Sequence, residues 1–143
     1  MLVSTVLKDK GSAVYTARSG QSLEDVAKLL AEKRIGAVVV TSQFGEIDGI
    51  LSERDIVRAM AVAGGAVINQ PASDFMTKSV FTCSPDETVD DLMELMTSRR
   101  IRHVPVVDGR RLIGLISIGD VVKHKIAKAE MEFEAMRQYI AAN

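Results

Sequence analysis

The sequence predicts a mixed α/β protein built from two copies of one β-α-β-β-α unit. The main observation is an internal repeat, because residues 16–40 align with residues 82–106 at a constant offset of 66. One residue is lost in the following turn, and residues 49–57 then align with residues 114–122 at an offset of 65. Identical residues are few, but polarity and turn residues match along both copies. Self-similarity of this kind indicates a duplicated structural unit.

Each copy starts with a short extended piece and a helix, and the same signals mark both. The extended pieces are residues 14–16 and 80–83. Ser22 and Thr88 are suitable N-caps, and acidic residues follow them in the first turn, where the helix dipole favours negative charge. Apolar residues at helical spacing continue each helix.

A β-hairpin and a second helix complete each copy. In both copies a β-branched apolar run is joined to another strand by a short turn that contains glycine, which is typical of a hairpin. Ser52 or Ser117 then begins the second helix. The strands are expected at 37–41 and 47–51 and at 104–107 and 112–116, with turns at 43–46 and 108–110.

The repeat sets the expected domain limits. Repeat 1, with an N-terminal helical segment, covers residues 3–63, and a linker covers 64–71. Repeat 2 covers 72–125, with a helical turn near its start, and residues 126–143 continue a C-terminal amphipathic helix. Two copies related by a pseudo-two-fold axis can cover sheet faces that neither could cover alone.

Composition excludes several classes of protein. The 143 residues are 47% hydrophobic and 26% charged, as in globular domains and unlike disordered chains. The net charge of −1 makes a general nucleic-acid binder improbable. The single cysteine, Cys83, fits a reducing compartment. The apolar run at 59–68 is too short to span a bilayer, and we expect a cytoplasmic protein without a membrane segment.

The junction between the hairpin and the second helix is the strongest candidate site. It reads Ser52-Glu-Arg-Asp55 in repeat 1 and Ser117-Ile-Gly-Asp120 in repeat 2. A serine and an aspartate at a helix start form a cap, which is the structural interpretation. The same groups, with free backbone N–H groups beside them, also suit a sugar phosphate, because aspartate can accept hydrogen bonds from ribose hydroxyls. Both interpretations stay open.

Cations form a second candidate feature. Arg102 and His103 lead a strand that is otherwise apolar, and packing alone does not explain a charged pair there. Arginine at a strand mouth suits phosphate. The cations that end the preceding helices (Lys33, Arg34, Arg99 and Arg100) have a simpler explanation, since basic side chains stabilise the last carbonyls of a helix.

In this order and spacing, the motifs resemble a tandem pair of cystathionine-β-synthase (CBS) domains, also called a Bateman module. The resemblance covers roughly residues 3–125 and rests on residues 49–55, 74–77, 102–108 and 114–120. It implies adenosyl ligands such as AMP, ADP, ATP, NAD(H) or S-adenosylmethionine in clefts between the repeats. It also implies homodimers that form a flat disc of four units.

The resemblance assigns roles to particular residues. The Ser–Asp pairs would meet ribose and phosphate, Arg102 and His103 would meet phosphate, and backbone near residues 13–16 and 77–82 would frame adenine. The ligand-binding residues expected on this basis are Ala13, Val14, Tyr15, Thr16, Ile35, Gly36, Ala37, Ser52, Arg54, Asp55, Thr77, Ser79, Val80, Phe81, Thr82, Arg102, His103, Val104, Pro105, Ser117, Ile118, Gly119 and Asp120.

The two repeats differ in their cations. Gly36 and Ala37 stand where repeat 2 has Arg102 and His103, and Gly119 stands where repeat 1 has Arg54. We therefore expect one occupied cleft, or two clefts of different affinity.

Two functions remain from these observations. The first is a non-catalytic sensor of adenine nucleotides that passes a conformational change to a regulated partner protein. The alternative is a structural homodimerisation module without a physiological ligand. An enzyme using Cys83 or His103 is disfavoured, because no catalytic or metal-binding motif accompanies them and Cys83 has no acid–base pair nearby in sequence. His124, on a helix, is expected to be solvated.

The C-terminal helix carries an apolar stripe. Spacings of four and three alternate along it, as at positions a and d of a coiled coil. The stripe packs on the protein's own body, on a second subunit or on another protein. Its members are Val122, Ile126, Ala129, Phe133, Met136 and Ile140.

Overall fold

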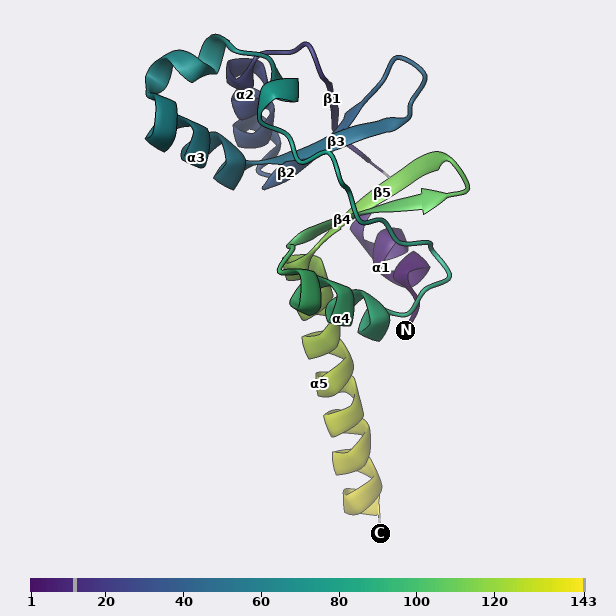
Figure 1. The fold of residues 1–143 in the computed structure, drawn as a ribbon. Helices are drawn as coiled ribbons and strands as arrows, with labels where there is room; N and C mark the ends of the chain where they lie inside the picture. The colour runs from purple at the N-terminus through teal and green to yellow at the C-terminus, as the bar shows by residue number, and fades with distance from the viewer. Residues whose placement is uncertain (12, 143) are drawn as a thin grey trace.

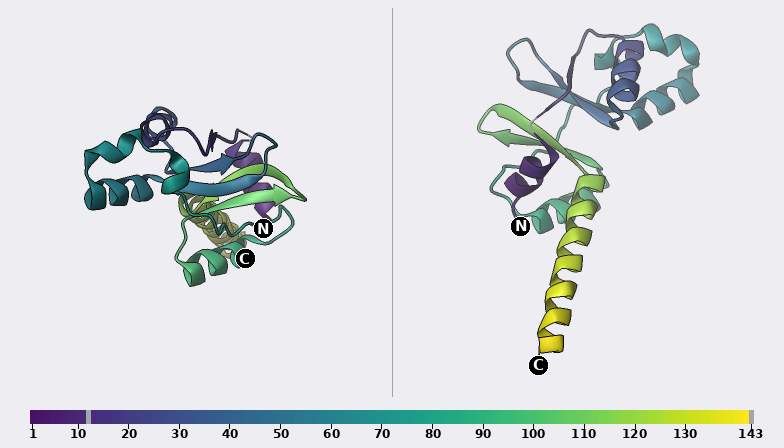
Figure 2. Two further views of the ribbon diagram at one scale, coloured as in Figure 1. Left: turned by 45° about the horizontal axis from the view of Figure 1, so that its top comes forward. Right: turned by 180° about the vertical axis from the view of Figure 1, so that it is seen from behind.

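A computed structural model describes residues 1–11 and 13–142 and shows the duplicated unit (Figure 1). Two sheets lie next to each other between the helices of the two repeats (Figures 1 and 2). The elements are α1 Val3–Lys10, β1 Thr16–Arg18, α2 Leu23–Lys33, β2 Ala37–Thr41, β3 Ile47–Ser52, α3 Glu53–Ala63, the 3-10 helices η1 Gly65–Asn69 and η2 Ala72–Asp74, α4 Val89–Arg99, β4 His103–Asp108, β5 Arg111–Ser117 and α5 Ile118–Ala142.

The first helix of each repeat begins and ends in the same way. The Ser22 hydroxyl accepts a hydrogen bond from the Asp25 N–H at 3.1 Å, and the Thr88 hydroxyl accepts one from the Asp91 N–H at 3.1 Å. Arg34 and Arg100 end α2 and α4 in the left-handed conformation, each with φ of 54°. The capping predictions are confirmed.

The two sheets differ in their first strand. In repeat 1, β1 pairs in parallel with β2, and β2 pairs antiparallel with β3. In repeat 2, β4 and β5 form the predicted hairpin, but the extended piece at 80–83 is reduced to a single bridge between Cys83 and Val106. Pro85 lies where the next hydrogen-bonding residue of the strand would be, and it has no N–H to continue the ladder.

The first segment of each repeat packs on the other repeat. In α1, Val3 and Val6 are fully buried in the core of repeat 2, with Leu7 beside them. Ala72 and Met76, at the start of repeat 2, pack in the core of repeat 1. The limits 3–63 and 72–125 therefore follow the order along the chain. In space, the first segment of each repeat belongs to the core of the other repeat.

Two equivalent glycines make room for this exchange. A Cβ on Gly49 would lie 2.7 Å from Sδ of Met76, and a Cβ on Gly114 would lie 2.4 Å from Cδ2 of Leu7. The Cβ on Gly49 would also lie 2.8 Å from the Thr77 carbonyl oxygen, so a larger residue there would displace the backbone of the incoming segment, whereas at Gly114 the Leu7 side chain would have to move. The exchange ties the two repeats into one unit.

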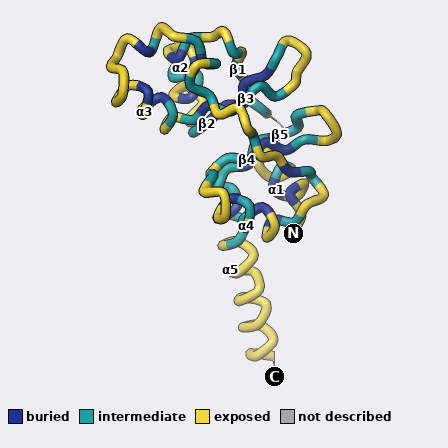
Figure 3. Tube along the Cα trace, in the orientation of Figure 1, coloured by how far each residue is buried: buried dark blue, intermediate teal, exposed yellow. Residues whose placement is uncertain are grey.

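Helix α5 leaves the body after its first turns. Val121 is its only buried residue among those described, and residues 126–142 are all exposed as the helix projects into solvent (Figures 1 and 3). The interpretation in which the apolar stripe packs on the protein's own body is therefore wrong, because all six residues of the stripe are exposed. His124 is not solvated as expected, since its side chain is 15% exposed and Nε2 lies 3.7 Å from Oδ2 of Asp9.

Candidate functional site

Two neighbouring clefts between the repeats share Gly36 and His103 in their walls. Cleft 1, of about 210 Å³, is lined by Gly36, Ile50, Ser52, Glu53, Arg54, Asp55, Arg58, Thr77, Ser79, Val80, Phe81, Arg100, Ile101, Arg102 and His103. Cleft 2, of about 320 Å³, is lined by Lys10, Ala13, Val14, Tyr15, Arg34, Ile35, Gly36, Ala37, His103, Leu115, Ser117 and Asp120.

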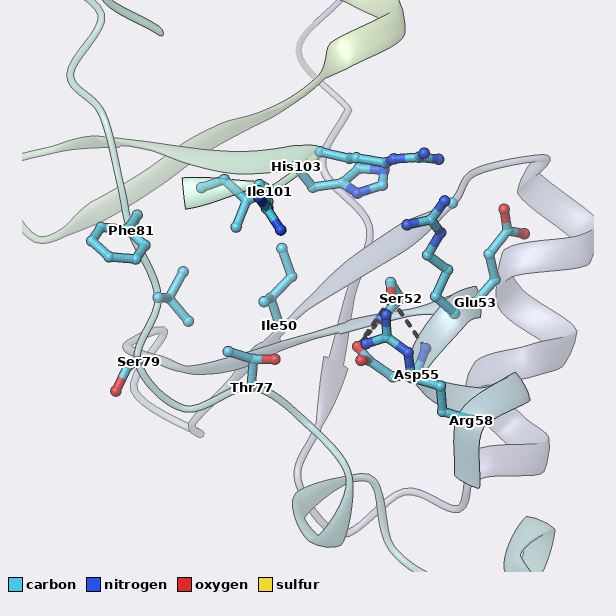
Figure 4. Close-up of a pocket in the computed structure, with 15 residues that line it drawn as sticks. Ile50, Ser52, Glu53, Asp55, Arg58, Thr77, Ser79, Phe81, Ile101 and His103 are labelled. Carbon is cyan, nitrogen blue, oxygen red and sulfur yellow. Dashed lines mark hydrogen bonds between the residues drawn. The ribbon is translucent and has the colours of Figure 1, made fainter. Parts of the chain in front are cut away.

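The polar floor of cleft 1 is the start of α3. The Ser52 hydroxyl accepts from the Asp55 N–H at 3.3 Å, while Oδ2 of Asp55 accepts from the Ser52 N–H at 2.9 Å and from the Ser52 hydroxyl at 3.0 Å (Figure 4). This is a complete capping box, so the structural interpretation of the motif is confirmed. Asp55 keeps its second oxygen available for hydrogen bonds from a ligand.

The remaining walls of cleft 1 separate apolar groups from cations. Ile50, Phe81 and Ile101 gather at one end, and Ser52 and Asp55 lie at the other (Figure 4). The backbone of Thr77 exchanges two hydrogen bonds with Ile50, of 3.0 and 2.9 Å, which holds this wall against β3. Four arginines also line the cleft and leave it with positive charge beside the carboxylates: Arg54, Arg58, Arg100 and Arg102.

In cleft 2, Lys10 of α1 forms an ion pair with Asp120, the carboxylate equivalent to Asp55. Oδ2 of Asp120 accepts from the Ser117 N–H at 2.9 Å and from Nζ of Lys10 at 2.7 Å, and Nζ also donates to the Leu115 carbonyl at 2.6 Å. Burial acts to raise the pKa of Asp120, but the hydrogen bonds from Lys10 and Ser117 and the Lys10 charge outweigh it, so the pKa lies below its ordinary value. Asp120 is therefore an ionised, already paired carboxylate.

His103 lies between the clefts. A Cβ on Gly36 would lie 3.2 Å from Nε2 of His103, so an arginine at this position of repeat 1 would crowd the imidazole. Burial, and next the Lys10 charge, lower the pKa of His103 below its ordinary value, although Asp120 and Glu53 act in the opposite direction. The imidazole is neutral at neutral pH.

Most of the residues expected from the sequence line one of the clefts. The residues Thr16, Thr82, Val104, Pro105, Ile118 and Gly119 lie outside both clefts. Val104 is buried in the core of repeat 2, and Pro105 is buried on the opposite face of β4. Because successive strand residues point to opposite faces, these two side chains cannot both face one cleft.

Several lining residues escaped sequence reasoning. Arg34 and Arg100 align at the repeat offset of 66, and an arginine at the same position of both repeats could have indicated that each lines a cleft. No local pattern pointed to Lys10, which is 110 residues away from Asp120 in the chain. The others are Ile50, Glu53, Arg58 and Leu115.

Cys83 is a buried free thiol. Burial, and next the charge of Glu87, raise the pKa of the Cys83 thiol to about 12, so thiolate is scarce at neutral pH. Within the described residues no group of three or more His, Cys, Asp or Glu side chains could hold a metal ion. Over the same residues, no helix is both long and apolar enough to cross a membrane.

The fold and the paired clefts define a tandem pair of small α/β domains, and comparison with known proteins gives the family. The CBS domain model matches residues 11–62 and 72–127, so the chain belongs to the CBS-domain family. CBS-domain proteins are generally regulatory and non-catalytic. A curated relative is the mitochondrial CBS domain-containing protein CBSX3 of Arabidopsis thaliana, 33% identical over 96% of this chain and 71% of that protein.

Solved structures agree with this assignment. The CBS-domain containing protein ATU1752 from Agrobacterium tumefaciens has a TM-score of 0.85 and 46% identity, over 87% of this chain and 99% of that one. The CBS domain pair of protein MJ0100, solved in complex with 5-methylthioadenosine and S-adenosylmethionine, has a TM-score of 0.81 and 29% identity, over 90% and 98% of the two chains.

Proposed function

We propose that the protein is a non-catalytic sensor that binds an adenosyl ligand (AMP, ADP, ATP, NAD(H) or S-adenosylmethionine) between its two repeats, with cleft 1 as the main site. The observation that carries this proposal is the composition of cleft 1. It combines a carboxylate and hydroxyl at a helix start, apolar walls and four arginines within one space between the repeats. Each group suits a different part of a nucleotide.

The proposed pose follows the polarity of the cleft. Adenine stacks near Ile50 and Phe81, where backbone groups near Thr77 supply hydrogen bonds. Ribose hydroxyls donate to Asp55, and phosphate lies among the arginines, which bind it with charge-assisted hydrogen bonds. The adenosyl ligands in the CBS domain pair of protein MJ0100 support this ligand class.

Cleft 2 is the weaker site in this proposal. A ribose that approaches Asp120 competes with the ammonium of Lys10, which already donates to that carboxylate at 2.7 Å. Breaking the ion pair subtracts from the gain of binding.

The exchanged segments give the ligand a way to act on the whole molecule. Thr77, Ser79 and Phe81 line cleft 1, and they follow directly after Met76, which packs in the core of repeat 1. A ligand held between the repeats favours one relative placement of them, and a partner protein can distinguish that placement.

We further propose a homodimer in the form of a disc, which works in the cytoplasm.

A structural dimerisation module is the second candidate. One observation favours it: Asp55 and Asp120 already have hydrogen-bond partners within the chain, so neither needs a ligand. The two candidates differ in their response to nucleotides, because tight binding to the folded state raises the melting temperature.

The test is a melting experiment on the full chain with AMP, ADP, ATP, NAD and S-adenosylmethionine, with guanosine monophosphate as the control. The sensor predicts a rise with at least one adenosyl ligand and none with the control. Mass spectrometry of small molecules released from the purified protein then identifies a ligand carried from the cell. No rise with any adenosyl ligand and no released ligand would support the structural module.

A further inference from the structure

The projecting part of α5 exposes the apolar stripe defined above, from Val122 to Ile140. The exposed fraction is 43% at Val122 and 67% at Ile140, and Phe133 and Met136 are equally open. A helix of this kind is marginal when isolated in water, and burial of its apolar side stabilises it. Packing against a partner helix would bury the stripe and stabilise α5.

The stripe faces away from α1. Asp120, His124 and Ala127 line a groove between α5 and α1. At 100° per residue these three positions lie on the opposite side of α5 from Val122 and Ile126. A second helix can thus reach the stripe without displacing α1, and the views from front and back show open space along α5 (Figures 1 and 2).

Charges beside the stripe favour another copy of the same helix. With Ile126 and Phe133 at position a, Lys125 and Glu132 occupy position g, and Glu130 and Arg137 occupy position e. In a parallel, in-register pair, each g residue faces the e residue of the next heptad in the other helix. Lys125 then faces Glu130, and Glu132 faces Arg137, so every such contact joins opposite charges.

The antiparallel arrangement lacks this match. The spacing of four, three, four, three and four reads the same in both directions, so the apolar stripe itself does not choose an orientation. In an antiparallel pair, e residues face e residues. Lys123 would face Arg137, and Glu130 would face its own copy, which places like charges together.

We propose that α5 pairs with α5 of a second copy of this chain as a parallel, in-register, two-stranded coiled coil from Val122 to Ile140. This inference concerns assembly and does not depend on a nucleotide. Lys125 also contacts Asp90 of α4, so the start of the coil is anchored to the body of each copy. Both bodies then lie at the same end of the coil.

Disulfide trapping tests the orientation in the full chain. A Met136→Cys variant places a cysteine against itself only in the parallel pair, and mild oxidation should convert most of the protein to a covalent dimer. The native Cys83 is 3% exposed and leaves the background low. A Glu134→Cys variant, on the other side of the helix, is the control and should stay monomeric on denaturing gels.

Two results would overturn the proposal. In an antiparallel pair Met136 faces Ile126, so trapping only in a mixture of Ile126→Cys and Met136→Cys variants would refute the parallel orientation. Trapping with none of the stripe cysteines, in variants that melt like the parent, would refute self-pairing and assign the stripe to a different protein.

Charge reversal tests the register. In the Met136→Cys background, Glu132→Lys should slow trapping by about tenfold at low salt, because two attractive contacts become repulsive. Adding Arg137→Glu should restore most of the rate. Lys128→Glu, a charge reversal on the side of α5 that borders the groove to α1, is the control and should change the rate little. Failure of the second reversal to restore trapping would refute this register.

Discussion

Cleft 1 and cleft 2 are built from equivalent parts of the two repeats, yet their carboxylates have different neighbours. Asp55 is bonded only within its own capping box and faces a space with four arginines. Asp120 accepts the equivalent hydrogen bond from the Ser117 N–H and another from the ammonium of Lys10. The comparison teaches that duplication conserves the cap, while a residue from outside the repeat changes what the cap can bind.

The difference arises from the exchanged segments. The first segment of each repeat packs on the sheet of the other repeat, over Gly49 in repeat 1 or Gly114 in repeat 2. On the sheet of repeat 1 this segment is an extended chain that exchanges backbone hydrogen bonds with Ile50. On the sheet of repeat 2 it is the helix α1, and its last residue, Lys10, reaches the Leu115 carbonyl with a side chain instead.

Removing the carboxylates is expected to produce the largest effect. Asp55→Ala should weaken AMP binding at the tight site by roughly 2–4 kcal/mol, since charge-assisted hydrogen bonds to ribose are lost. Asp120→Ala should leave that site nearly unchanged. Calorimetry on both variants checks this. Equal losses would show that the clefts are equivalent, and no loss in either would leave Ser52–Asp55 as a cap alone.

Removing a cation from cleft 1 should have the next largest effect. Arg102→Met is expected to weaken AMP by about 1.5–3 kcal/mol while changing adenosine binding little, because only AMP carries a phosphate. Arg110→Met, in the β4–β5 turn, is the matched control. The difference between AMP and adenosine should also shrink as salt rises. Equal affinities for AMP and adenosine in the parent protein would refute the phosphate role.

Removing the lysine that pairs with Asp120 should increase the ligand affinity of cleft 2, by a smaller amount. Lys10→Met is expected to tighten the weaker site by about 1 kcal/mol or less, because the ion pair it breaks is partly exposed. Lys8→Met on the same helix is the control. Calorimetry should show a second binding phase that is stronger than in the parent. Weaker binding at cleft 2 would mean instead that Lys10 itself holds the ligand.

The smallest expected effect concerns His103. Its pKa in the folded protein is below the ordinary value of 6.5, so the unfolded chain takes up the proton first. The contribution of His103 to stability is fully present above pH 6.5, falls as the pH drops below that value, and levels off below the pKa of the folded protein. Urea unfolding from pH 7.5 to 5 should show a shallower decline in His103→Gln than in the parent. Identical declines would contradict the shifted pKa.

Local signals explain how far the sequence alone could lead. Caps at Ser22 and Thr88, the hairpins and the length of α5 follow from neighbouring residues, and the structure agrees with them. The Ser–Asp motifs indicated the clefts for the same reason. The exchange of segments and the pairing of Lys10 with Asp120 depend on tertiary packing between distant parts of the chain, which no local pattern encodes.

Calorimetric titration of the parent protein with AMP tests the difference between the clefts most directly. It gives the number of sites per chain and their affinities in one experiment. The account predicts one tight site per chain. Any second binding phase should have a clearly lower affinity, because Lys10 already donates a hydrogen bond to Asp120. Two sites of equal affinity per chain would contradict it.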